Sequence, residues 1–317
     1  MSKFGQRVKI TVTDKKNDIV LESESLRVDF DIRNIPGYSR GTFKIYNLSD
    51  AVSGNIVNVE GSKVTLEVQL HEGTTYKLVD SWPISNAINE LILPNNIVTL
   101  YAYNGIKNAV LEKQINIEVS GPSLEKNLRA ILSAAKHKGS ISFISFPSDV
   151  LKQTSSRNTA HFPSSAMAAI MKLQRQYPFE MYTNDKGIVF LYKPNIGQLK
   201  WTNLEEKREE IVLETVNMVS NPVLSLSTIN ITSNLDGRIV PSSLLSTANL
   251  ITAGVGSDEE TVQITSGFIK NYVTGRTKYQ AFAVQHRGSN YTKDWTTIVT
   301  GIAPTSGRKM PLVNWFR

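Results

Sequence analysis

Short stretches in which polar and apolar side chains alternate recur along this chain, and this period of two constrains its fold more than any other feature. Residues 7–12 read Arg-Val-Lys-Ile-Thr-Val, and the same alternation returns at 26–32 and at 42–46. Such alternation is typical of a strand with one buried face. Residues 34–38 (Asn-Ile-Pro-Gly-Tyr) contain a Pro-Gly turn, so we expect the second and third stretches to form a hairpin.

Similar stretches continue through the first and last parts of the chain. They lie at 63–70, 97–103, 223–231, 261–264, 279–286 and 295–300. The stretch 223–231 is the longest, and we expect it to be one continuous strand. Short strands at regular intervals, without long helices between them, predict a sandwich or a small barrel.

The pattern changes in the middle of the chain. After Ser123, a candidate N-cap, apolar residues follow at helical spacing, and Gly139 closes the segment. A second helix is predicted after residues 163–165, and Pro178 ends it. Residues 179–192 then read as a hairpin with its turn at Asn-Asp-Lys-Gly. This part is predicted to be a small α+β unit.

The length of 317 residues favours two or three domains over a single core. We therefore expect a mainly β fold with an α+β insert. The expected domains are residues 1–117, 118–204 and 205–317.

Composition excludes several classes of protein. Cysteine is absent, which excludes disulfides, thiolate zinc sites and cysteine nucleophiles and fits a reducing compartment. The N-terminus shows no secretory signal, and no apolar run approaches the roughly 18 residues of a membrane helix. We expect a protein without a membrane anchor that is made and folded in the cytoplasm.

The positive charge is concentrated in the middle third. Residues 118–200 carry 11 Lys and Arg against 5 Asp and Glu, a balance of +6, whereas residues 1–117 carry 13 of each. A local basic surface can attract nucleic acid, a membrane or an acidic protein. These basic residues are spread out, so a solvated helix surface is the simpler interpretation.

A search for catalytic or ligand-binding motifs finds little. The four histidines (His71, His137, His161 and His286) do not have the short spacings of a metal pair. Gly254-Val255-Gly256 lacks the third glycine of a dinucleotide site, and a loop is the simpler interpretation. The adjacent carboxylates Glu209 and Glu210 lie in a charge run that reads as a solvated connector. We therefore predict no catalytic residues, no metal, no cofactor and no enzyme activity.

Aromatic and basic residues alternate near the end of the chain, in a set that could stack single-stranded nucleic acid. This set is Tyr279, His286, Arg287, Tyr291, Lys293 and Trp295. The alternative is that the aromatic residues anchor a core or a subunit interface, as aromatic residues on strands usually do.

Three stretches together resemble phage baseplate hub proteins. Residues 41–49 (Gly-Thr-Phe-Lys-Ile-Tyr-Asn-Leu-Ser) resemble a strand and turn near the start of these hubs. Residues 235–243 occupy the place of a turn before a pair of barrel strands. Residues 279–288, followed by 294–297 (Asp-Trp-Thr-Thr), resemble the closing hairpin, in which a Val-x-His-x-Gly strand precedes an Asp-Trp-x-Thr strand. The hubs have His-x-Gly-Asp at that turn, whereas this chain has Ser289-Asn290 after the glycine, so an acidic role there cannot be assumed.

The resemblance implies a fold and an assembly. It implies two tube-like β-barrel domains flanking the α+β domain, in a homotrimer that joins a sixfold tail tube to a threefold central spike. Implied partners are the tail tube or tube-initiator protein, the spike and other baseplate proteins. DNA would pass through the central channel without specific binding. The location would be the tail baseplate of the virion, with assembly in the host cytoplasm.

Six residues are the expected core or interface anchors of such a protein: Phe43, Ile45, Tyr46, Tyr279, Phe282 and Trp295. We expect Asn47 to make a turn. Three other functions stay open at this point. They are a tail-associated cell-wall hydrolase, a DNA-binding module that uses the basic middle domain, and another tail component with the same barrel.

Overall fold

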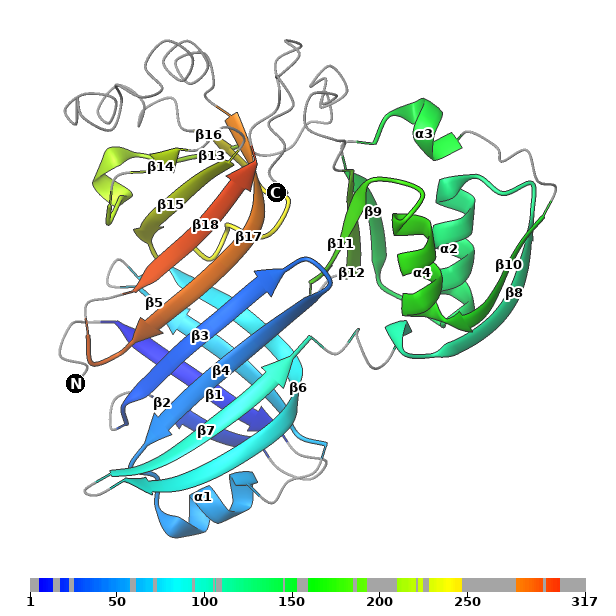
Figure 1. Ribbon diagram of the computed structural model, residues 1–317. Helices are drawn as coiled ribbons and strands as arrows, with labels where there is room; N and C mark the ends of the chain where they lie inside the picture. Colours follow the sequence, from blue (N-terminus) through cyan, green and yellow to red (C-terminus); the bar gives the residue numbers. More distant parts are fainter. Residues whose placement is uncertain are drawn as a thin grey trace, which may run out of the picture.

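A computed structural model describes most of the chain between residues 6 and 302 (Figure 1). The described residues are 6–13, 18–22, 26–57, 61–70, 73–92, 95–104, 106, 110–144, 146–152, 159–184, 187–192, 210–220, 222–224, 228–246, 278–292 and 295–302. They form a mainly β structure with a smaller α+β unit at its side, which confirms the predicted fold class (Figure 1).

The first part of the chain is made of strands, with one short helix. These elements are β1 (Arg7–Thr13), β2 (Asp18–Glu22), β3 (Val28–Ile35), β4 (Tyr38–Tyr46), α1 (Asp50–Val57), β5 (Lys63–Gln69), β6 (Thr75–Ile92) and β7 (Asn95–Tyr103). The predicted hairpin is confirmed, because β3 and β4 pair antiparallel from Val28↔Ile45 to Ile35↔Tyr38. The alternation did not reveal β6 or α1. Asn47 ends β4 in a left-handed conformation with φ 59°, so it makes the expected turn.

The α+β unit contains both predicted helices. Its elements are β8 (Gln114–Ser120), α2 (Leu124–Ala134), β9 (Ser140–Ile144), α3 (Ser148–Lys152), β10 (Thr159–Ser165), α4 (Ala166–Gln174), β11 (Phe179–Asn184) and β12 (Gly187–Tyr192). Ser123 caps α2 by accepting a hydrogen bond from the amide of Lys126, and Ser165 caps α4 in the same way through Ala168. Helices α2 and α4 lie between the three-stranded sheet β11-β12-β9 and the ribbon of β8 and β10 (Figure 1).

The last part returns to β structure. Its elements are β13 (Glu210–Val212), the 3₁₀ turn η3 (Thr215–Asn217), β14 (Val223–Leu224), β15 (Thr228–Asn234), β16 (Leu244–Ser246), β17 (Lys278–Ser289) and β18 (Thr296–Ile302). One expectation was wrong, because residues 223–231 are not one strand. Strand β14 pairs antiparallel with β15, with Val223 opposite Asn230, so the chain reverses between them. A period of two identifies the buried face of a segment but does not exclude a turn within it. The predicted strand 261–264 lies outside the described residues.

One sheet joins the first and last parts of the chain. Its strand order is β14-β15-β18-β17-β3-β4-β7-β6-β5-β1-β2, and β13 and β16 attach beside β17. The link is the antiparallel pairing of β17 with β3, in which six residue pairs run from Val284↔Asn34 to Ser289↔Asp29. The pairings of the described strands end at β2 and β14 and do not close into a barrel. The domain boundaries given above stay a prediction.

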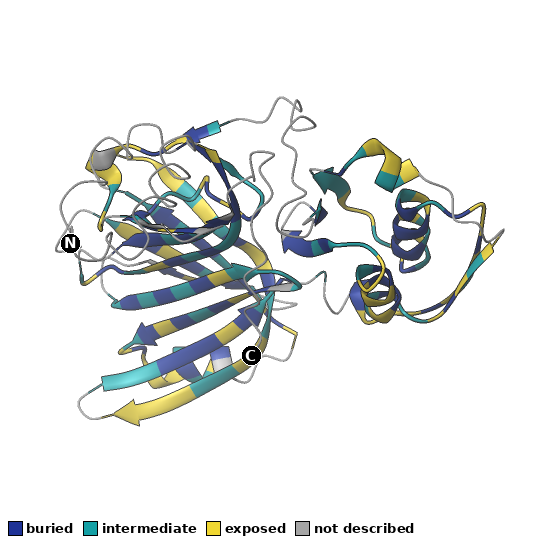
Figure 2. Cartoon of the chain, turned by 45° about the horizontal axis from the view of Figure 1, so that its top comes forward, coloured by how far each residue is buried: buried dark blue, intermediate teal, exposed yellow. Residues whose placement is uncertain are grey.

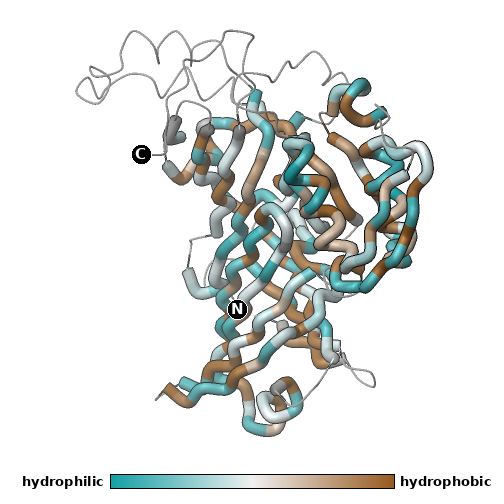
Figure 3. Tube along the Cα trace, turned by 45° about the vertical axis from the view of Figure 1, so that its right-hand side comes forward, coloured by the Kyte–Doolittle hydropathy of each residue, from teal (hydrophilic) through white to brown (hydrophobic). Residues whose placement is uncertain are grey.

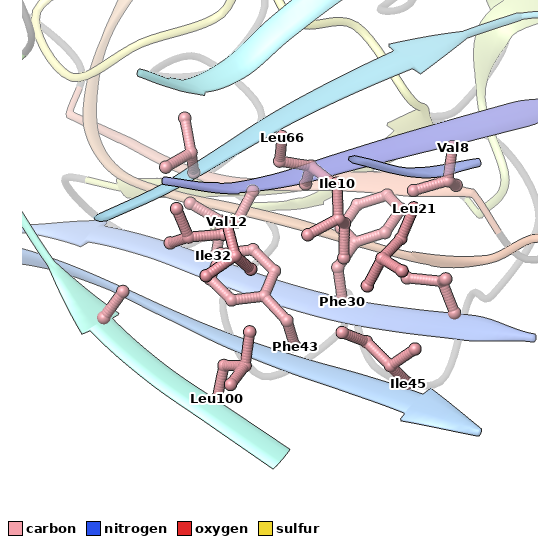
Figure 4. Close-up of a cluster of buried hydrophobic side chains, with 14 of the residues drawn as sticks. Val8, Ile10, Val12, Leu21, Phe30, Ile32, Phe43, Ile45, Leu66 and Leu100 are labelled. Atoms are coloured by element: carbon pink, nitrogen blue, oxygen red, sulfur yellow. The ribbon is translucent and has the colours of Figure 1, made fainter. Parts of the chain in front are cut away.

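The sheet curls around a hydrophobic core. Buried side chains from β1 and β5 meet those from β3, β4 and β7, as Ile10, Phe30, Phe43 and Leu100 show in Figure 4. Buried and exposed residues alternate along these strands (Figure 2), and so do hydrophobic and hydrophilic ones (Figure 3). The α+β unit has its own core around α2 and α4, and a third cluster lies among β15, β17 and β18.

Gly288 on β17 is required for the packing between the two parts of this sheet. A Cβ atom at this position would lie 2.8 Å from Phe30 Cζ and 3.1 Å from Trp295 Cγ. Both rings are buried, and they pack edge to face with centroids 5.6 Å apart. Neither ring can move away without disturbing the core.

We therefore predict that Gly288→Ala lowers the free energy of unfolding by about 1–3 kcal/mol, the usual cost of overpacking a core. Urea denaturation would measure the change. Gly54→Ala is the matched control, because a Cβ at Gly54 on helix α1 meets no atom within 4 Å. The control should be neutral or stabilising by up to about 1 kcal/mol. Equal losses in both variants would contradict the packing argument.

Candidate functional site

The α+β unit is attached to the sheet at the tip of the β3–β4 hairpin. The amide of Gly37 donates to the carbonyl of Met181 at 2.6 Å, and Ser39 Oγ donates to the carbonyl of Thr183 at 3.0 Å. Strand β11 is the edge of the small sheet, so these bonds cap carbonyls that its sheet neighbour β12 does not reach. The hairpin tip thus acts as a partial further strand for the α+β unit.

A β-bulge in β17 makes the second attachment. The pairing with β18 shifts between Ala281 and Ala283, which leaves Phe282 without an opposite residue. The Phe282 ring packs against Tyr182 of β11, with centroids 6.1 Å apart and planes at 90°. Val189 and Leu191 of β12 complete this small apolar cluster. We call the hairpin-tip bonds and the cluster around Phe282 the joint.

Tyr182 is the buried polar residue of the joint. Its side chain is only 2% exposed, and its hydroxyl has no hydrogen-bond partner among the described residues. Burial strongly raises the pKa of Tyr182, so the phenol stays neutral. An unpartnered buried hydroxyl costs stability, which means that the ring and not the hydroxyl holds the joint.

Asn290 clamps the start of β3. Its side-chain Oδ1 accepts from the amide of Val28 at 2.8 Å, and its Nδ2 donates to the carbonyl of Leu26 at 2.7 Å. The amide of Asn290 also donates to the carbonyl of Val28 at 3.2 Å. An aspartate could accept from Val28 but could not donate to Leu26. This is a physical reason for asparagine at position 290, whereas the acidic residue of the His-x-Gly-Asp turn corresponds to Ser289.

His286 lies inside the sheet structure and not in a cleft. Its ring is 2% exposed, and Nδ1 lies 3.0 Å from Thr297 Oγ1. Thr297 Oγ1 also accepts from the amide of Asp236 at 2.9 Å, so its own proton is available to Nδ1 of the ring. Burial lowers the pKa of His286 to about 4. The neutral imidazole therefore ties β17 and β18 to the loop after β15.

The six expected anchor residues lie in different places. Phe43 and Ile45 are fully buried in the core inside the curled sheet, and Trp295 joins that core while donating from Nε1 to the carbonyl of Ser289 at 2.6 Å. Tyr279 is buried in the cluster of the last part of the chain. Phe282 lies at the joint.

Tyr46 is the sixth of these residues and lies on the outer side of the sheet. Its hydroxyl donates to Asp29 Oδ2 at 2.9 Å, and the Arg27 guanidinium lies over its ring at 4.4 Å. Partial burial alone would raise the pKa of Asp29, but hydrogen bonds from Arg27, Ser289 and Tyr46 hold it below its ordinary value.

The proposed nucleic-acid stacking set is not one surface. Tyr279, His286 and Trp295 are buried, whereas Arg287 and Tyr291 are exposed. Lys293 lies outside the described residues, as do His71, Glu209, Gly254 and Gly256. In the part of the chain that the structure describes, no three His, Asp or Glu side chains come together as metal ligands, and no helix is long and apolar enough to cross a membrane.

Exposed apolar side chains lie at both ends of the sheet. At one end, Val20 on the edge strand β2 is 48% exposed. At the other end, Val212, Val216 and Val219 are exposed near β13 and β14. The outer edges of β2 and β14 have no strand partner among the described residues, and such open edges can pair with another chain.

Neither the joint nor the Asn290 clamp could be predicted from the sequence alone. The departure from the His-x-Gly-Asp turn falls at Ser289 and gave no signal for Asn290, whose role depends on where the Leu26 carbonyl lies. A bulge at Phe282 leaves no pattern, because Ala281 and Ala283 continue an ordinary strand sequence.

No family model and no curated protein matches this sequence. Solved structures do match it. The 43 kDa tail protein of prophage MuSo2 from Shewanella oneidensis has a TM-score of 0.53 and 7% identity, covering 96% of this chain and 100% of that one. The tail protein from Neisseria meningitidis MC58 has a TM-score of 0.52 and 8% identity, covering 95% and 97%.

A third structure is the E. coli c3393 protein, described as a component of the type VI secretion system with structural similarity to the T4 bacteriophage tail proteins gp27 and gp5. It has a TM-score of 0.51 and 11% identity, covering 95% of this chain and 80% of that one. These likenesses extend over nearly the whole chain at low identity. The chain therefore has the fold of phage and prophage tail proteins.

The buried imidazole predicts a pH dependence of stability. His286 has a pKa of about 4 in the fold against an ordinary value of 6.5, so below pH 6.5 the unfolded chain binds more protons than the folded one. The contribution of the neutral His286 to the free energy of unfolding is therefore complete above pH 6.5. It falls by up to about 3 kcal/mol as the pH drops to 4. Urea unfolding of the wild type and of His286→Gln at pH 7, 5.5 and 4.5 would measure it. The wild type should lose more stability than the variant, and parallel losses would contradict the assignment.

The joint predicts opposite effects for two substitutions of one residue. Tyr182→Phe removes a hydroxyl without a partner, so the melting temperature should stay the same or rise. Tyr182→Ala removes the ring and should cost about 3 kcal/mol or more. Thermal unfolding followed by circular dichroism would compare them. A clear loss of stability in Tyr182→Phe would show that the hydroxyl has a partner in solution.

Proposed function

We propose that this chain is a structural subunit of a phage tail baseplate hub, located in the virion and assembled in the host cytoplasm. Three copies would form a ring that joins the sixfold tail tube to the threefold central spike around a channel. The partners would be the tail tube or tube-initiator protein, the spike and other baseplate proteins. The observation that carries the proposal is the fold, which is shared with tail proteins over at least 95% of the chain.

The open ends of the sheet support a ring of this kind. The two open ends, at β2 and at β14, are different surfaces, so an end-to-end contact between copies joins unlike patches. Contacts between unlike patches generate closed rings when the rotation between subunits fits. We propose that the β2 end of one copy meets the β14 end of the next, where Val20 and Val216 provide exposed apolar surface.

The domain arrangement belongs to the same proposal. Residues 1–117 and 205–317 would act as two tube-like halves, and residues 118–204 as the α+β domain between them. The hairpins β3–β4 and β17–β18 support this division, because they lie side by side in one sheet, one from each half. Three copies with two halves each would present six similar units to a sixfold tube.

Light scattering of the purified chain tests the proposed assembly. We expect a stable mass near three times the 35.3 kDa of one chain. Val20→Lys places a charge on edge strand β2, which discourages pairing with another strand, so it should shift the mass toward the monomer. The melting temperature measured below the assembly concentration should not change, because Val20 is half exposed.

Val240→Lys is the matched control, since Val240 is an exposed valine outside any strand. This variant should keep the mass of the wild type. A wild-type dimer or a persistent monomer at high concentration would contradict trimer formation by the chain alone. If the Val20→Lys variant still forms trimers, the proposed contact at β2 is contradicted, but the proposal that the chain forms a trimer is not.

A further inference from the structure

The outer side of the sheet carries positive charge across the junction of its two parts. In the strand register, Arg33 of β3 lies directly opposite Arg40 of β4, and Asp29 lies opposite Lys44. Across the β17–β3 pairing, Arg287 lies opposite Asp31. Directly opposite residues project to the same side of a sheet. We call the side that carries Arg33, Arg40, Lys44 and Arg287 the basic sheet face.

Ion pairs neutralise only part of this charge. Arg27 and Arg33 pair with the carboxylates of Asp29 and Asp31, at 2.9 and 2.8 Å. The remaining cations, Arg40, Lys44 and Arg287, form no ion pair within the described residues, and all three are exposed. Partial burial would raise the pKa of Asp31, but hydrogen bonds from Arg33 and Gln285 hold this pKa below its ordinary value. The charge of Arg40 lowers the pKa further, so the Asp31 carboxylate is ionised at neutral pH. Glu90 of β6 is exposed on the same side, because Ile97 lies opposite both Tyr46 and Glu90, so the net excess on the face is two positive charges.

The register places Arg33 opposite Arg40, although Arg33 also pairs with Asp31. Like charges directly opposite each other across two strands are destabilising. The two arginines line a solvent-open hollow of about 410 Å³ together with Asp31, Thr42, Tyr101 and Tyr103. An anion in or above the hollow would offset this repulsion. The hydroxyl groups beside it are further hydrogen-bond donors.

We propose that the basic sheet face binds the phosphate backbone of double-stranded DNA without reading its sequence. Arginine, lysine and hydroxyl side chains are the groups that contact phosphates in such complexes. Arg40 and Lys44 lie four residues apart on one strand, a span of about 13 Å, and duplex DNA carries one phosphate per about 1.7 Å of its axis, so phosphates lie within reach of both cations. A regular polyanion fits this row of cations.

The DNA-binding alternative drawn from composition used the middle domain, whereas the basic sheet face lies on β3, β4 and β17. The net charge of the sequence is largest in residues 118–200, which pointed to the α+β unit. A charge count does not show which cations share one surface. A single copy carries the whole basic sheet face, so the inference does not require the trimer. If the hub proposal also holds, this face is the part of the channel wall that contacts passing DNA.

Two charge-matched variants test the proposal. The first combines Arg40→Gln, Lys44→Gln and Arg287→Gln. The second combines Lys138→Gln, Lys152→Gln and Arg175→Gln, three exposed cations of the α+β unit without ion pairs among the described residues. The probe is a fluorescein-labelled 30-base-pair duplex, titrated by anisotropy from 25 to 200 mM NaCl. Affinities that depend on phosphate contacts fall steeply over about this range of salt concentration.

The wild type should bind more weakly as salt rises, and the first variant should bind more weakly than the wild type at low salt. Each lost phosphate contact lowers the slope of log K against log salt by about 0.9, so the first variant should lose up to about 2.7 in slope. The second variant should keep the slope of the wild type. Equal losses in both variants, or a loss in the second alone, would overturn the proposal.

Two further measurements keep the result interpretable. Arg40→Lys with Lys44→Arg preserves the charge and should preserve the salt slope, which separates charge from folding. Polyglutamate of matched charge serves as a competitor. The duplex should compete with the probe better than polyglutamate does. Equal competition would assign the face to an acidic protein and overturn the DNA assignment.

Discussion

The rest of this structure depends on the antiparallel pairing of β3 with β17. These strands are about 250 residues apart in the chain, so closing the intervening loop costs entropy that local contacts must offset. Three features strengthen the pairing. Asn290 holds both the Leu26 carbonyl and the Val28 amide, Gly288 leaves room for Phe30, and Trp295 closes the core from the other side. Without this pairing the first and last parts of the chain would share no sheet.

The same two strands also position the α+β unit. The tip of the β3–β4 hairpin donates hydrogen bonds to β11, and the bulge in β17 directs Phe282 onto Tyr182. Because the β3–β4 hairpin and β17 are neighbours in one sheet, the orientation of the α+β unit follows from the β3–β17 pairing. The basic sheet face has the same origin, since Arg287 comes from β17 while Arg40 and Lys44 come from β4. The joint and the basic sheet face therefore both depend on one long-range contact.

The sequence predicted individual strands and helices better than it predicted which strands lie next to each other in the sheet. Alternation identified β1, β3, β4, β5 and β7, and Ser123 and Ser165 marked the starts of α2 and α4 because a side-chain oxygen there satisfies a free amide. A period of two cannot tell which strand lies alongside, so the β3–β17 pairing was not predictable. The same alternation also failed to show that the chain reverses between β14 and β15. Ion pairing likewise escapes a charge count, which is why the basic sheet face was not recognised.

Hydrogen exchange of the intact chain, followed by mass spectrometry, tests the central pairing most directly. If β3 and β17 form one cooperative structure, amides in residues 28–35 and 284–289 should exchange together and with similar protection, as amides within one unfolding unit do. Strand β14, at the edge of the sheet, should exchange faster. Protection of residues 28–35 with rapid, independent exchange of residues 284–289 would show that the two parts of the sheet are not joined in solution, and would contradict the account.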